Sequence, residues 1–146
     1  PALLLFGNKY LDEPIDYAIY LITAALGFAA VENGLFLLIP AQQELYTQVV
    51  ATGNLRFLGA TVLHAITAGA MGYMIGIRFF QSRKKRFIGA VEGLIIASVI
   101  HILFNLIIVK GVESHIILLM ASMWGSVILL TILLKRLAVN FERLHQ

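Results

Sequence analysis

Four long apolar stretches constrain the fold of this chain more than any other feature of its sequence. A helix that crosses a bilayer needs about 20 mostly apolar residues, and each stretch reaches that length. The stretches cover about Ile15–Ile39, which we expect Pro40 to end, Phe57–Ile77, Phe87–Val109 and Ser114–Leu134. The sequence therefore predicts an all-α fold, a polytopic bundle of four spanning helices at about 15–39, 57–77, 87–109 and 114–134.

The composition agrees with a membrane protein and excludes several other classes. Hydrophobic residues make up 60% of the chain and charged residues 13%, whereas a soluble domain carries about a quarter charged residues. The net charge of +3 is too small for a nucleic-acid-binding domain, so we expect no nucleic-acid partner. The absence of cysteine excludes disulfides and thiolate chemistry.

We expect residues 1–146 to form a single transmembrane domain that is part of a larger membrane protein. The chain opens with Pro1 rather than Met, and the apolar segment Ala2–Phe6 is too short to span a bilayer. We interpret this segment as the end of a further helix upstream.

Basic residues predict how the bundle lies in the membrane. One side of the predicted bundle carries nine Lys and Arg residues, in the segments 9, 78–86 and 135–143, whereas the other side has only Arg56 and Lys110. Cytoplasmic loops carry the excess of positive charge. The pattern predicts a multi-pass protein of the cell membrane with both visible termini in the cytoplasm.

Three ionisable side chains lie inside the apolar stretches at a similar depth. Glu32, His64 and His101 each stand eight or nine residues from the outer end of their stretch, which is about 12–14 Å at a rise of about 1.5 Å per residue. Ionisable groups in the membrane are costly and mark functional sites by default. We therefore predict that the three residues meet.

Small residues accompany both histidines, and residues four apart share one face of a helix. The face of His64 also carries Ala60, Ala68, Gly72 and Gly76, and the face of His101 carries Gly93, Ala97 and Asn105. Small residues let helices approach closely in lipid. We expect a buried cluster of one carboxylate, two imidazoles and the Asn105 amide.

Such a cluster is suited to hydrolysis by an activated water molecule. In one version Glu32 is the general base, and His and Asn donors stabilise the oxyanion. In the other, Glu32, His64 and His101 bind Zn²⁺, with water at the open position. The residues leave open a non-enzymatic membrane protein that binds haem or transports metal ions or protons, and a bundle in which they only join helices.

Three segments resemble the PrsW family of intramembrane proteases, which is related to the CAAX-prenyl protease superfamily. They read DEPIDYAIYLITAALGFAAVEN at 12–33, RFLGATVLH at 56–64 and HILFN at 101–105. The resemblance covers about Asp12–Val109 and implies catalytic roles for Glu32, His64, His101 and Asn105. It also implies a membrane-anchored protein substrate, such as an anti-sigma factor, and leaves metal dependence open.

One motif of the family is missing. The family pattern includes a glutamate pair of the EExxK type upstream of the DEP segment, but Pro1–Leu11 contains no acidic residue. The resemblance therefore implies that this pair, which is a candidate general base, lies in an upstream segment that the present sequence lacks.

Overall fold

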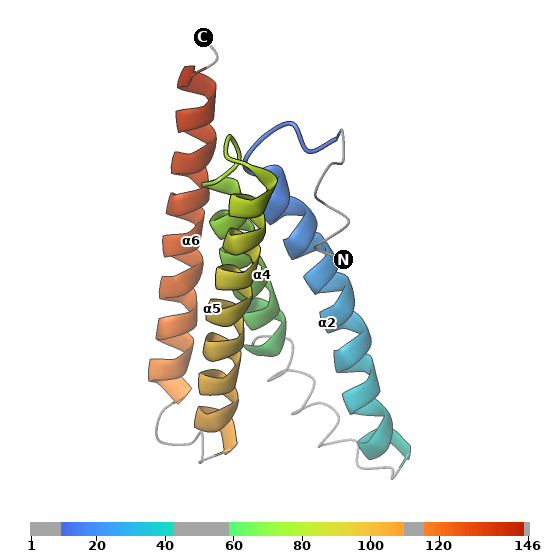
Figure 1. Cartoon of the computed structure of the whole chain (residues 1–146). Coiled ribbons are helices and arrows are strands. Elements are labelled where there is room, and N and C mark those ends of the chain that lie inside the picture. Colours follow the sequence, from blue (N-terminus) through green and yellow to red (C-terminus); the bar gives the residue numbers. More distant parts are fainter. Residues whose placement is uncertain (1–9, 43–58, 110–115, 145–146) are drawn as a thin grey trace.

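The described part of the chain is helical, as the sequence predicts. The computed structural model describes residues 10–42, 59–109 and 116–144, and within them it contains no strand. The four helices are α2 (Asp16–Gln42), α4 (Thr61–Gly76), α5 (Arg83–Val109) and α6 (Ile116–Leu144) (Figure 1). Each helix corresponds to one of the four apolar stretches, so the predicted all-α fold is confirmed.

The helix ends differ from the ends of the apolar stretches. The prediction that Pro40 ends the first helix is wrong, because α2 continues to Gln42. Proline removes one backbone donor, which does not prevent a final turn. At the other end of the chain, α6 extends beyond the predicted Leu134 to Leu144. Apolar runs mark the part of a helix that suits lipid, whereas its backbone hydrogen bonds continue into polar residues that favour helices.

Three of the helices are long and apolar enough to cross a membrane. The candidate spans in the described residues are Asp16–Leu35, Arg83–Phe104 and Ile117–Arg143. The described helix α4 has 16 residues, which is shorter than the roughly 20 that a span needs. The predicted stretch 57–77 begins at Phe57 and Leu58, which lie outside the described residues.

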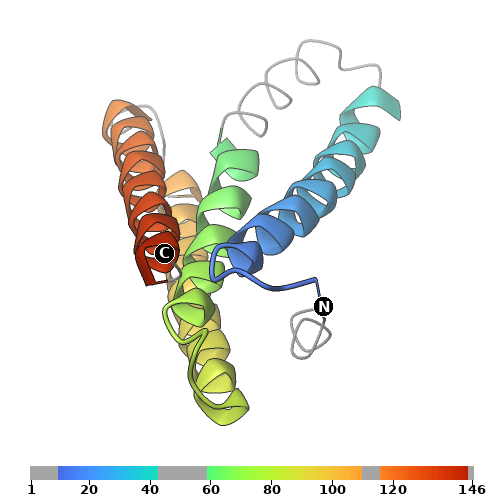
Figure 2. The same cartoon turned by 90° about the horizontal axis from the view of Figure 1, so that it is seen from above.

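Helix α4 is the centre of the bundle and packs against α2, α5 and α6 (Figure 2). Two clusters of buried side chains surround it. One joins α4 to α5 and α6 and contains Leu63, Ile66, Phe104, Leu119 and Met123. The other includes Tyr17 of α2, Ile75 of α4 and Ala90 of α5. The short central helix is thus enclosed by the three longer ones.

Glycines allow α4 to approach its neighbours closely. A Cβ atom on Gly72 would overlap the backbone of Ala18 in α2, and one on Gly93 of α5 would lie 2.7 Å from Cα of Met71. A Cβ on Gly76 would lie 2.5 Å from the carbonyl oxygen of Pro14. These positions belong to the small-residue faces expected from the sequence, and all three lie at helix contacts.

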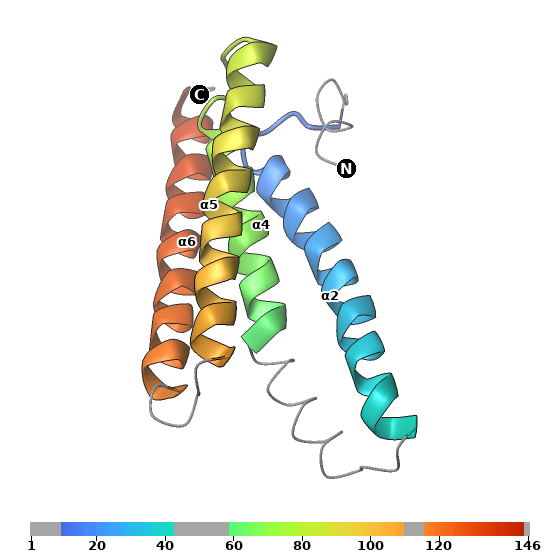
Figure 3. The same cartoon turned by 60° about the horizontal axis from the view of Figure 1, so that its bottom comes forward.

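Polar side chains link the helices at the end where α5 begins, which we call the basic end (residues 78–86). Nη2 of Arg78 lies 2.6 Å from Oε2 of Glu92, and Nη1 of Arg86 donates to the hydroxyl of Tyr17 at 3.0 Å. From this end, α2 runs away from α4, and the two helices diverge (Figures 1 and 3).

Gly72→Ala should destabilise the bundle. The added methyl group has no space against Ala18, and overpacking of this kind lowers the free energy of unfolding by roughly 1–3 kcal/mol. The measurement is unfolding of the purified protein in bicelles. Gly27→Ala is the matched control, because nothing lies within 4 Å of a Cβ at Gly27. Equal stability of the two variants would contradict the close α2–α4 contact.

Candidate functional site

Helices α2, α4 and α5 bring Glu32, His64 and His101 together, and we call these three residues the polar cluster. Nε2 of His64 lies 2.8 Å from Oε2 of Glu32, within hydrogen-bond distance. The ring centroids of His64 and His101 are 5.5 Å apart, with the ring planes tilted by 59°. The three side chains therefore lie close together, as the positions of Glu32, His64 and His101 in the sequence predict.

The direction of the helices explains why these positions meet. Helices α2 and α4 run antiparallel, so that Ala18 faces Gly72 near the basic end, while Glu32 faces His64 farther along. The close glycine contact aligns the two helices along each other near the basic end. Glu32 then reaches His64 with its longer side chain, where the helix axes are farther apart (Figure 3).

Two further contacts flank the polar cluster along α2. The ring of Phe28 meets that of His64 edge-on, with centroids 5.5 Å apart and planes at 69°. On the other side, Nδ2 of Asn33 donates to Oγ1 of Thr61 at 2.9 Å. Glu32 thus lies between an aromatic contact and a second hydrogen bond from α2 to α4.

The polar cluster is shielded but accessible. The side chain of His64 is 12% exposed and that of Glu32 is 29% exposed, while His101 is half-buried. In the part of the chain that the structure describes, no hydrogen bond engages the ring nitrogens of His101. A water molecule or a substrate group can therefore reach both the carboxylate and the second imidazole.

Asn105, the fourth predicted catalytic residue, lies one turn after His101 in α5. Its backbone is helical, but its side chain lies outside the described residues. Residues four apart share one helix face, which places Asn105 on the face of His101. Its predicted role at the site stays a prediction.

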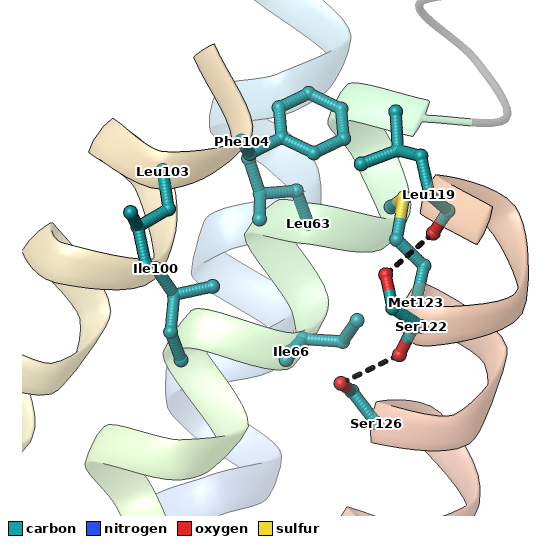
Figure 4. Close-up of a pocket in the computed structure, with 9 residues that line it drawn as sticks. All are labelled: Leu63, Ile66, Ile100, Leu103, Phe104, Leu119, Ser122, Met123 and Ser126. Carbon is teal, nitrogen blue, oxygen red and sulfur yellow. Dashed lines mark hydrogen bonds between the residues drawn. The ribbon is translucent and has the colours of Figure 1, made fainter. Parts of the chain in front are cut away.

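A cavity of about 160 Å³ lies between α4, α5 and α6 (Figure 4). Its lining is almost entirely apolar and contains none of the three residues of the polar cluster; it comprises Leu63, Ile66, Ile100, Leu103, Phe104, Leu119, Ser122, Met123 and Ser126. The hydroxyls of Ser122 and Ser126 donate to backbone carbonyls of α6 itself, those of Leu119 and Ser122. The lining therefore contains no titratable side chain, and its two serine hydroxyls already donate hydrogen bonds within α6.

Comparison with known proteins agrees with the family resemblance of the three sequence segments. The model of the family described as "PrsW family intramembrane metalloprotease" matches residues 1–134. This chain belongs to the PrsW family.

A curated relative is "Protease PrsW" from Clostridioides difficile (strain 630), which is 30% identical over 146 residues. The match covers 100% of this chain and 55% of the relative, so the chain spans about half the length of that PrsW protein. Comparison with solved structures gave no match. The expected upstream segment with an EExxK-type pair stays a prediction.

The PrsW family is described as a family of metalloproteases, so we ask whether the side chains of the polar cluster are suitable ligands for a metal ion. A carboxylate and two imidazoles are typical ligands of catalytic zinc. However, among the residues that the structure describes, no three His, Cys, Asp or Glu side chains are arranged to hold a metal ion. The described side chains therefore show no metal site, and the predicted metal role of Glu32, His64 and His101 stays a prediction.

Sequence reasoning missed one contact at the site, the hydrogen bond between Asn33 and Thr61. Threonine in a helix commonly bonds a carbonyl of its own preceding turn, as Thr23 and Thr67 do here. The sequence carries no signal that Thr61 instead bonds a second helix.

Proposed function

We propose that this protein is an intramembrane protease that hydrolyses a peptide bond in a membrane-anchored protein. The observation that carries the proposal is the hydrogen bond of 2.8 Å between Glu32 and His64, with the ring of His101 beside it. Membership of the PrsW family supports the same activity. An anti-sigma-factor-like protein is the proposed kind of substrate.

In the proposed reaction, Glu32 acts as the general base. Its carboxylate takes a proton from a water molecule while the water oxygen attacks the carbonyl carbon of the substrate. The proton then passes to the amide nitrogen, the bond between carbon and nitrogen breaks, and the products are a carboxylic acid and an amine. Glu32 returns to its ionised form.

The imidazoles have separate roles in this mechanism. An ionised carboxylate can only accept hydrogen bonds, so Nε2 of His64 carries the hydrogen that it shares with Glu32. This bond orients the carboxylate toward water. His101, together with Asn105, polarises the substrate carbonyl and stabilises the oxyanion, a role in which prearranged donors contribute strongly to catalysis.

The geometry favours hydrolysis over the haem alternative. A histidine ligates haem iron through a free ring nitrogen, whereas the ring of His64 lies directly against the rings of Phe28 and His101. Nε2 of His64 is also hydrogen-bonded to Glu32. Transport of metal ions or protons has no specific observation in its favour.

Glu32→Gln should abolish cleavage, because an amide cannot act as a general base, although it keeps nearly the same size. The measurement compares cleaved fragments of membrane proteins in cells with the wild-type protein and with the variant. We expect at least one membrane-anchored protein to be cut only in wild-type cells. Glu142→Gln, on the exposed side of α6, is the control and should cleave normally. Identical fragments in wild-type and Glu32→Gln cells would refute the proposed protease function.

Zinc is a second proposal for how water is activated, supported by the family description and by the donor chemistry of Glu32, His64 and His101. Zinc would supply a nucleophilic water near neutral pH. The glutamate mechanism predicts that 1,10-phenanthroline leaves cleavage by the purified, reconstituted protein unchanged. Loss of cleavage that added Zn²⁺ restores would instead support a metalloprotease.

We further propose that the basic end of the bundle faces the cytoplasm. The chain has no cysteine. A single introduced cysteine is therefore the only thiol of the protein that can react, and its labelling shows on which side of the membrane it lies. A cysteine at exposed Lys84, which lies at the basic end, should resist a membrane-impermeant maleimide in intact cells and react after the cells are opened. Labelling in intact cells would reverse the proposed orientation.

A further inference from the structure

Beyond Ala29, few of the described side chains of α2 are buried against the bundle. Ala29 is fully buried, whereas large apolar side chains beyond it are open, with Val31 64% and Leu35 60% exposed. Among the described side chains of α2 beyond Ala29, only Glu32 and Asn33 are partly buried. The two polar residues therefore mark the place where this part of α2 meets the bundle.

Asn33 and Glu32 are consecutive in α2, and both bond to α4. Nδ2 of Asn33 donates to Oγ1 of Thr61 at 2.9 Å, and Thr61 precedes His64 by about one helical turn. Because the helices are antiparallel, the Asn33–Thr61 bond lies on the side of the Glu32–His64 pair that is farther from the basic end. Two neighbouring bonds thus join the same faces of α2 and α4.

The close glycine contact does not reach this place. Gly72, which touches the backbone of Ala18, stands eight residues after His64, or about 12 Å along the helix axis. Between the two levels the helices diverge (Figure 3). The position of the Glu32 carboxylate relative to His64 therefore depends on side-chain contacts near Glu32 itself.

We propose that Asn33 and Thr61 are positioning residues for the reaction, which hold α2 against α4 so that the carboxylate of Glu32 stays oriented by His64. This inference rests on the proposed protease function. Neither residue takes part in proton transfer, and their bond acts through Glu32. Displacing a catalytic group by about 1 Å can reduce the rate about a hundredfold, so the loss should appear in kcat.

Thr61→Val tests the proposal, because valine keeps the shape of threonine and removes the hydroxyl. The complete protein is reconstituted in liposomes with a single-span membrane protein that is cut in wild-type but not in Glu32→Gln cells. We expect kcat, normalised to folded protein, to fall by about 10–100-fold with KM within about twofold. Thr61→Ser should restore kcat, and Asn33→Ala should reproduce the loss.

The double variant separates one shared bond from two independent effects. If Asn33 and Thr61 act through their mutual hydrogen bond, the double variant Asn33→Ala with Thr61→Val is no slower than the slower single variant. Multiplied losses would overturn the proposal. Thr23→Val is the matched control, because Oγ1 of Thr23 donates only to the carbonyl of Ile19 in its own helix, and it should keep wild-type kcat.

The positioning proposal and the protease proposal would be overturned by different results. If Glu32→Gln is inactive while Thr61→Val and Asn33→Ala keep wild-type kcat, the positioning role alone is wrong. A loss in Thr61→Val that only follows the amount of folded protein would also overturn it. If Glu32→Gln cleaves normally, the protease function itself is wrong.

Discussion

The free-energy cost of placing a carboxylate where water is scarce explains why Glu32 is paired in the polar cluster. A carboxylate in an apolar environment must be paired, hydrogen-bonded or protonated, and Glu32 of α2 meets this requirement through His64 of α4. The bond ties together two helices whose remaining surfaces in this region are largely apolar. The same requirement keeps the carboxylate away from lipid, on the side of α2 that faces the rest of the bundle.

The central helix α4 connects the packing of the bundle to its chemistry. Near the basic end, Gly72 brings its backbone against Ala18 of α2, whereas at His64 only longer side chains reach from one helix to the other. Beyond that contact the two helices diverge (Figure 3), and Glu32 and Asn33 of α2 bridge them through hydrogen bonds to His64 and Thr61 of α4.

The chain contributes a coherent part of a PrsW family protein. Its match covers about half of the length of a curated PrsW protease, yet the carboxylate and both imidazoles of the polar cluster come from three helices within this part. Asn33 and Thr61, which form the neighbouring hydrogen bond between α2 and α4, also lie within this part. The cavity between α4, α5 and α6 is almost entirely apolar and includes none of these residues, so the acid–base chemistry that we propose belongs to the α2–α4 contact.

The sequence by itself determined the helical class, the approximate helices, and the helix faces on which Glu32, His64 and His101 meet, because lipid imposes a length on apolar runs and a helix imposes a fixed rise and rotation. It failed at the end of α2, which continues past Pro40 to Gln42. Only the tertiary structure decided which helix is central, which nitrogen of His64 meets Glu32, and that Thr61 bonds Asn33. Those features depend on how far apart two helices lie, and that distance is set by side-chain packing between segments remote in sequence.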